Sequence, residues 1–304
     1  GQVTPSAWPV NLAVDGTLSQ DNGVPGYEGN FSLASIQDED RKDNAWRAGG
    51  SFSANMDGLN VPSFEFRYGP EDRVLGLDGT AELAYSGQKR FEIRGRAKQV
   101  DLDRIFGGGP QTPVSADNAA SRLIAALKAV PIPDMDGVIA LDIPAVVVGG
   151  GLAQDVKLDL ETTLGGWRVA RLAVRAPGRT VIATQGDLGL EPDLTYRGSV
   201  SIASEQPGAF AAWWRQTGKG ATAIQPISME GRLSLVPDGV ALDNMRLNLA
   251  GSEATGGLSY QKPRSGNAVF SLSLDADKLD IDQVETLAGL FERPEDGVKD
   301  LDVS

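Results

Sequence analysis

Apolar and polar residues alternate along most of this chain with a period of two. Residues 51–54 (SFSA), 65–68 (EFRY) and 271–274 (SLSL) are examples, and this is the period of a β-strand with one apolar face. Such runs recur roughly every ten to twelve residues with turn residues between them, a spacing typical of antiparallel β proteins. The pattern predicts a mainly β protein: an elongated, curled antiparallel sheet built from repeated hairpin units, with a few short helices.

Helical spacing of apolar residues occurs in three segments. Residues 115–130 carry an apolar stripe and stop before Pro131, a residue that ends a helix. Residues 207–217 and 279–291 are shorter candidates of the same kind. The most apolar run, residues 138–152, is interrupted by an acid, a proline and three glycines, so it is too short for a membrane span and predicts two buried strands.

A nine-residue pattern recurs three times. Residues 58–66 (GLNVPSFEF), 166–174 (GWRVARLAV) and 239–247 (GVALDNMRL) all read Gly-Φ-x-Φ-x-x-Φ-x-Φ, where Φ is apolar. Each opening glycine follows an Asp or a Gly, and such dipeptides favour a type I′ hairpin turn with positive φ. The two-residue gap shifts the phase of the alternation, which predicts a β-bulge or sharp bend at the same point of each return strand.

A second pair of segments matches after two of these hairpins. Residues 91–105 and 270–284 align without a gap and share Phe, Ala and two Asp. The repeating unit is therefore a hairpin, another strand pair and an Asp-Φ-Asp step into a short helix; the middle copy lacks that step but also runs into a helix. We expect three units, 1–110, 111–220 and 221–304, which continue one sheet.

The composition narrows the chemistry. The 28 Lys and Arg face 41 Asp and Glu, a net charge of −13, and the 304-residue chain has neither His nor Cys. The acidic excess argues against nucleic acid as a partner. Without His and Cys, the common transition-metal ligands, the thiol nucleophile and a Ser-His-Asp relay are missing. We therefore expect no catalysis, no cofactor and no metal.

Paired carboxylates occur at matching repeat positions: Asp101 with Asp103, and Asp280 with Asp282. A functional interpretation is a calcium site or an acid–base pair. Each pair lies where a strand leads into a helix, however, and an aspartate there accepts hydrogen bonds from free N–H groups of the first helical turn. The EF-hand spacing is absent. Helix capping is the favoured interpretation for all four residues.

Glycine runs and tryptophans are weaker signals. Residues 107–109 and 149–151 are triple glycines that match neither phosphate-binding fingerprint, so we expect turns. Trp213 and Trp214 precede Arg215 and could stack on a sugar ring or lie at a membrane surface. Packing of that helix against the sheet is the favoured interpretation.

With no catalytic or metal-binding group expected, the apolar face of the strands is the remaining candidate for a binding surface. Strands with one apolar face cannot leave it in water, so helices, a second sheet or an apolar ligand must cover it. Helical material is scant here, which favours a groove that holds lipid; a closed core is the alternative. The candidate lipid-facing residues are the apolar positions of the three hairpins: Val61, Phe64, Phe66, Val169, Leu172, Val174, Leu242, Met245 and Leu247.

The order of these motifs resembles a known family. Residues 100–105 (VDLDRI), 279–284 (LDIDQV) and 136–143 (DGVIALDI), the last leading on to 165–169 (GGWRV), resemble the AsmA-like proteins of Gram-negative bacteria. The resemblance implies a periplasmic β protein, tethered to the inner membrane by an N-terminal helix, whose hydrophobic groove carries phospholipid toward the outer membrane. It supplies no catalytic residues. Because the chain opens at Gly1 without a leader, we expect an internal or C-terminal portion of such a protein.

The expected function is thus non-catalytic: binding or conducting phospholipid, or another acyl-chain lipid, for outer-membrane lipid homeostasis, with the inner membrane and envelope proteins as further partners. Two alternatives come from other classes. One is a scaffold that assists outer-membrane protein assembly by strand pairing at an open sheet edge. The other is a polysaccharide-binding or polysaccharide-cleaving β protein in which Trp213, Trp214 and the acidic pairs line a polar cleft.

Overall fold

A computed structural model describes residues 2–3, 10–21, 23–36, 46–69, 75–106, 114–128, 133–215, 225–262, 268–277 and 282. Over these residues the protein is one sheet of 17 strands with three short helices. The elements are β1 (Gln2–Val3), β2 (Val10–Asp21), β3 (Val24–Ser35), β4 (Trp46–Ala54), β5 (Gly58–Tyr68), β6 (Leu75–Ala84), β7 (Arg90–Arg96), β8 (Val100–Asp101), α1 (Leu102–Ile105), α2 (Ala116–Lys128), β9 (Asp136–Val148), β10 (Gly151–Thr163), β11 (Gly166–Ala176), β12 (Thr180–Gly189), β13 (Thr195–Ser204), α3 (Pro207–Arg215), β14 (Ile227–Val236), β15 (Gly239–Leu249), β16 (Ser252–Gln261) and β17 (Val269–Asp275).

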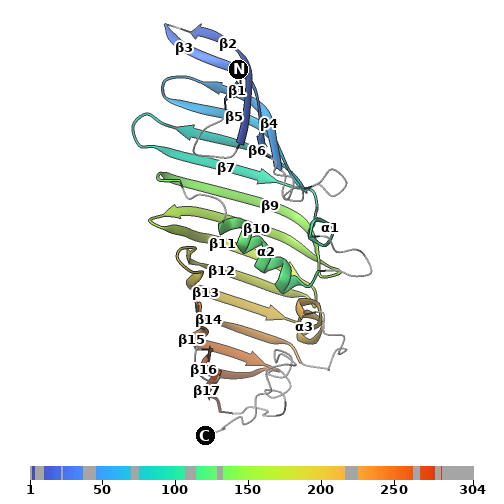
Figure 1. The fold of residues 1–304 in the computed structure, drawn as a ribbon. Coiled ribbons are helices and arrows are strands. Elements are labelled where there is room, and N and C mark those ends of the chain that lie inside the picture. The colour runs from blue at the N-terminus through green and yellow to red at the C-terminus, as the bar shows by residue number, and fades with distance from the viewer. Residues whose placement is uncertain are drawn as a thin grey trace.

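The strands stack in chain order along one axis (Figure 1). Each strand pairs antiparallel with the next from β1 to β7 and from β9 to β17. No described pairing joins β17 back to β2. Adjacent strands lie roughly 4.8 Å apart, so the sheet is about 70 Å long in the direction across its strands. A single long strand such as β2 spans only about 35–40 Å. The elongated, curled antiparallel sheet predicted from the alternation is confirmed.

One parallel step interrupts this order. β7 and β8 both run parallel to β9, and the backbone N–H of Ala97 between them donates to the carbonyl of Asp142 at 3.4 Å. A parallel pair needs a long crossover connection, and α1 and α2 lie in that connection. The chain has to return to the other end of the strands before β9 begins, and α1 and α2 are part of this return path.

The repeated gap forms a β-bulge in every copy. The pairing register shifts between Val61 and Phe64 in β5, between Val169 and Leu172 in β11, and between Leu242 and Met245 in β15. An extra residue restores the side-chain phase and bends the strand. The apolar residues on both sides of each gap therefore share one face, as the spacing predicts.

The hairpin turns lie where the sequence predicts them, but the type I′ explanation of the glycines is wrong. Gly58, Gly166 and Gly239 open the return strands and do not have positive φ; in the three dipeptides only Gly165 does, at 80°. A Cβ at these glycines would lie 2.7, 2.5 and 2.7 Å from a carbonyl oxygen of the next strand. Close backbone approach, which a single sequence does not reveal, requires glycine here.

The predicted helices are confirmed where the structure describes them. Residues 115–130 and 207–217 correspond to α2 and α3. The candidate at 279–291 lies outside the described residues except for Asp282. The run 138–152 forms β9 and β10 as expected, but Val138 and Leu152 at its ends are exposed, not buried. Among the helices that the structure describes, none is long and apolar enough to cross a bilayer.

Burial is shallow over most of the sheet. Half-buried and exposed residues alternate along β6, β12, β13 and β14. One large buried cluster joins β9 and β10 to α1 and α2 through residues such as Val146, Val148, Leu102 and Ala119. Helices thus cover the middle of the apolar face.

Candidate functional site

Apolar residues of neighbouring strands form rows along the long axis of the sheet. The first row passes through the fourth residue of each repeat and contains only apolar residues and glycine. Its successive register partners are Val61, Ala81, Ile93, Ile139, Leu160, Val169, Gly186, Gly198, Leu233, Leu242, Leu258 and Leu272. It is unbroken from β5 to β17.

Two further rows flank the first on the same face. Phe64 and Leu172 lie in the second row. Met245 lies at the end of this row, on the far side of the bulge in β15. In the third row, Val174 and Leu247 are joined through Ile182, Ile202 and Met229; Phe66 pairs with Leu77 at the same level of β5 and β6. The nine predicted lipid-facing residues therefore share one face, which we call the apolar trough.

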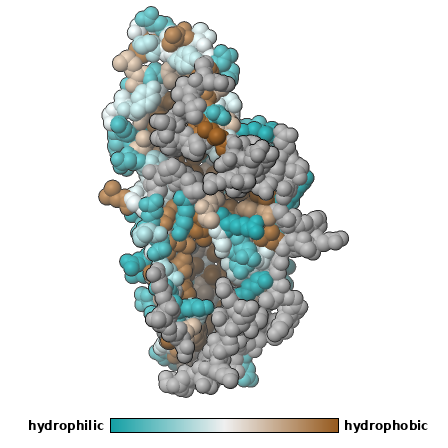
Figure 2. Space-filling view, in the orientation of Figure 1, coloured by the Kyte–Doolittle hydropathy of each residue, from teal (hydrophilic) through white to brown (hydrophobic). Residues whose placement is uncertain are grey.

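The trough is neither a uniformly open groove nor a closed core. Its members Val61, Val169, Leu242, Met245 and Leu247 are buried. Phe64, Phe66, Leu172 and Val174 are half-buried. Figure 2 shows hydrophobic side chains gathered along the middle of the visible face, between hydrophilic margins.

Helix α2 crosses the middle of the trough (Figure 1). Ala116 and Ala119, in its first half, belong to the buried cluster with Val146 and Val148. Leu127, near its other end, packs against a second cluster formed by Leu160, Trp167, Val169, Leu190 and Tyr196. The helix thus covers the first row where β10 and β11 meet.

The aspartates of the first Asp-Φ-Asp step have different roles. Asp101 is the N-cap of α1, and its Oδ1 accepts the N–H of Arg104 at 2.9 Å. Asp103 is buried and caps no helix end, so the capping interpretation is wrong for it. Its Oδ1 accepts N–H groups from Val114 at 3.1 Å and Gly149 at 2.9 Å, and its Oδ2 accepts that of Gly150 at 2.9 Å.

Asp103 therefore ties the β9–β10 turn to the segment before α2. Gly149 and Gly150 form that turn, with φ of 64° and 67°, as expected for a glycine run. Residues 107–109, the other run, lie outside the described residues, as does Asp280. Asp282 is exposed and helical. Among the described side chains, no group of three or more acids is placed to hold a metal ion.

The tryptophans of α3 have a packing role. Trp213 and Trp214 both contact Phe210 and the buried cluster under the helices. The Nε1 of Trp213 donates to the carbonyl of Val148 at 2.7 Å. With Trp213 bonded to β9 and Asp103 to a turn, these residues do not line a common polar cleft.

No family model, curated protein or solved structure matches the chain. The resemblance to AsmA-like proteins therefore stands on the order of the sequence motifs alone.

In the sequence Trp167 is only an apolar position of the repeat. Its side chain is 1% exposed, and its Nε1 has no hydrogen-bond partner among the described residues. Trp167 begins a fourth row of the trough, at the hairpin-turn margin, which continues through Leu188, Tyr196, Leu235, Val240, Tyr260 and Phe270. The sequence does distinguish Trp167 in one respect: it is aromatic, whereas the equivalent residues of the other two repeats, Leu59 and Val240, are aliphatic.

The outer face of the sheet is polar. Cross-strand ion pairs join Arg171 to Asp159 at 2.8 Å and Arg246 to Glu230 at 2.8 Å. Such exposed pairs contribute little to stability, but their charged side chains keep this face hydrated. The two faces of the sheet therefore have opposite solvation, and an apolar occupant fits only the inner one.

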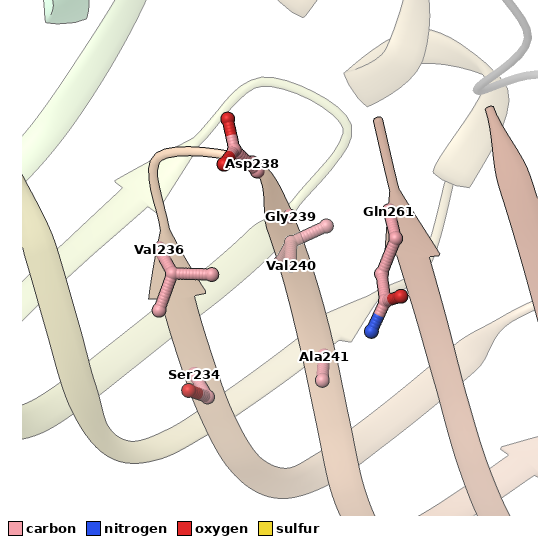
Figure 3. A pocket seen from close by; sticks show the side chains of 7 residues that line it. All are labelled: Ser234, Val236, Asp238, Gly239, Val240, Ala241 and Gln261. Atoms are coloured by element: carbon pink, nitrogen blue, oxygen red, sulfur yellow. The ribbon is translucent and has the colours of Figure 1, made fainter. Parts of the chain in front are cut away.

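Two hollows lie at the hairpin-turn margin. The larger, of about 1050 Å³, spans strands from β2 to β9, and its lining mixes Leu83 and Phe91 with Glu82 and Glu92. The smaller, of about 320 Å³, lies beside the β14–β15 turn, where Val236 and Val240 adjoin Asp238 (Figure 3). The lining of each hollow mixes apolar and polar residues, and Ser234, Val236 and Ala241 of the smaller one alternate with trough residues and so belong to the opposite face of the sheet.

Proposed function

We propose that this protein binds and conducts phospholipid, or another acyl-chain lipid, in the apolar trough, without catalysis. The observation that supports it is the first row, which continues from β5 to β17 without a polar side chain. Its only non-aliphatic members, Gly186 and Gly198, lie where the backbones of β12 and β13 approach closely, and the hydroxyl of Tyr196 lies over Gly198.

The energetics of such a path are favourable. Burying a methylene group stabilises a complex by about 0.8 kcal/mol, so an acyl chain is stabilised wherever the trough residues are only half-buried. Because the first row offers no hydrogen bond to break, moving from one strand to the next changes the free energy little. Charged headgroups remain at the hydrophilic margins, where burial of charge is avoided.

The cellular setting that we propose is based on the motif order alone. We place the protein in the periplasm of a Gram-negative cell, as part of an AsmA-like protein held at the inner membrane, where it supports outer-membrane lipid homeostasis. The first row crosses twelve strands, from β5 to β17, so at roughly 4.8 Å per strand it is about 50 Å long, longer than the roughly 30 Å hydrocarbon core of one bilayer. An elongated trough suits transfer between membranes better than storage of one lipid.

Lipid extraction followed by mass spectrometry tests this proposal. The purified chain is expected to retain phospholipid, and the delipidated chain to take it up from vesicles. Leu233→Glu places a charge in the first row, whereas Ser228→Glu adds the same charge to the exposed face of the same strand, β14. We expect uptake to be lost in the first variant and kept in the second. A wild-type chain that neither retains nor takes up lipid would contradict the proposal.

A second function is favoured by one observation. β17 is an edge strand without a described partner beyond it, and its Val269 and Phe270 are 55% and 42% exposed. Open edges of this kind accept a further strand, which would suit a scaffold for outer-membrane protein assembly. Crosslinking from Phe270 in cells would capture a β-rich partner if this is so. The polysaccharide alternative has no such support, because its tryptophans are packed.

A further inference from the structure

The indole of Trp167 is an unsatisfied buried donor in the fourth row of the trough. It lies on β11, one residue after the β10–β11 turn, and is 1% exposed. No described residue accepts a hydrogen bond from its Nε1. A buried tryptophan N–H almost always has a partner, because leaving it unpaired in an apolar environment costs free energy. An unpaired donor in this position calls for a physical reason.

The molecule does satisfy comparable groups nearby. Trp213 donates to the carbonyl of Val148 at 2.7 Å, and the hydroxyl of Tyr196, in the same cluster as Trp167, bonds to Thr184. The cluster around Trp167 otherwise consists of Leu160, Val169 and Leu190. It contains an N–H donor and apolar surface but no further acceptor directed at that donor.

The cover over this cluster is incomplete. Leu127, in the second half of α2, packs against it but is only half-buried, and Leu123 on the preceding turn is exposed. The first half of α2 is held more firmly by the buried Ala116 and Ala119. The second half of α2 is therefore held to the trough by fewer buried side chains than the first half.

The surroundings of Trp167 indicate which acceptor would fit. Among the described residues the only charged side chain that is buried is Asp103, at the β9–β10 turn, so a phosphate or carboxylate buried beside Trp167 would have no buried counter-charge, which is costly. A neutral carbonyl oxygen needs only one N–H donor. In a lipid, that group is the ester that joins an acyl chain to glycerol, and the apolar rows would take the chain.

We propose that Trp167 Nε1 is the hydrogen-bond donor of a lipid-binding position in the middle of the trough, which the second half of α2 covers when it is empty. Its ligand is an ester-linked acyl lipid, whose ester carbonyl accepts the indole N–H. This inference rests on the proposed function, since it assigns a specific binding position within the lipid trough.

Matched diester and diether phospholipids, equal in chains and headgroup, test the inference with the full delipidated chain. The ether lipid lacks the carbonyl. Wild type is expected to bind the diester about three- to tenfold more tightly, the range of one hydrogen bond. Trp167→Phe, which removes the N–H and keeps an aromatic ring, is expected to lose this preference. Trp213→Phe serves as the control and is expected to keep it.

The outcomes distinguish a failure of the role assigned to Trp167 from a failure of lipid binding as a whole. A wild type that binds both lipids equally overturns the role of Trp167 and leaves lipid binding standing, as does a Trp167→Phe variant that retains the ester preference. A wild type that binds neither lipid overturns the proposed function and this inference with it. The wild-type comparison remains decisive if the variant does not fold. In ¹⁵N-indole spectra, one of the five tryptophan signals should shift with the diester and not with the diether.

Discussion

The two aspartates of residues 101–103 should differ sharply when each is replaced by asparagine. Asp103 is buried and accepts three backbone N–H groups, whereas Asp101 accepts one, at the N-terminus of α1. Asparagine keeps one acceptor oxygen and replaces the other by an NH₂ donor. At Asp103 one backbone N–H then loses its partner and faces a second donor.

The expected magnitudes follow from these contacts. A hydrogen bond to a charged group contributes about 1.5–3 kcal/mol, and an unpaired buried N–H adds a penalty, so we expect Asp103→Asn to lower the free energy of unfolding by about 2–4 kcal/mol. Asparagine is as good an N-cap as aspartate. Asp101→Asn therefore loses only the charge–dipole interaction, about 0.3–1 kcal/mol.

Urea denaturation followed by circular dichroism measures both values. Hydrogen exchange adds a local test, because the amides of Gly149 and Gly150 should lose protection in Asp103→Asn and keep it in Asp101→Asn. Equal destabilisation by the two substitutions, or unchanged exchange at the β9–β10 turn, would refute the assignment of Asp103 as the link between that turn and the segment before α2.

Three further predictions concern other parts of the sheet. A Cβ at Gly198 would lie 2.2 Å from a carbonyl oxygen of β12, so Gly198→Ala should lower the free energy of unfolding by about 1–3 kcal/mol; Ser199→Ala is its control, and equal urea midpoints would contradict the close approach. Burial raises the pKa of the Tyr196 phenol, so the folded state keeps this proton to higher pH than the unfolded state and stability should fall as pH rises above about 10. Denaturation at pH 9 to 11 should show a shallower fall in Tyr196→Phe, and parallel curves would exclude this contribution. Trp213→Phe leaves a carbonyl of β9 without its donor and should cost about 1–3 kcal/mol more than Trp167→Phe, which loses no bond; the reverse order of melting temperatures would show that volume, not hydrogen bonding, dominates.

The local sequence pattern was sufficient for the strands and their irregularities. A period of two specifies which face each side chain takes, and the two-residue gap in the repeat specifies a bulge, because otherwise Phe64 would point to the opposite face from Val61. The stripe ending before Pro131 likewise placed α2. These features depend on residues close together in the chain, so one sequence contains the information.

The roles of other residues depend on their partners in distant segments of the chain. Asp103 has the same motif context as Asp101, yet it binds a turn about 46 residues away in sequence. The repeat glycines are required by carbonyl groups of the next strand. Sequence spacing says nothing about which backbone N–H group reaches a carboxylate or how closely two strands approach.

The sequence by itself determined an apolar face and the residues on it; the tertiary structure decided how that face is covered. The register of consecutive strands aligns Val61, Val169 and Leu242 in a single row, and the crossover to β9 lays α2 over its middle. Trp167, an ordinary apolar position in the repeat, becomes a buried donor without an acceptor only in that setting. Burial and hydrogen bonding are properties of surroundings assembled from distant segments, whereas side-chain alternation is a property of the chain.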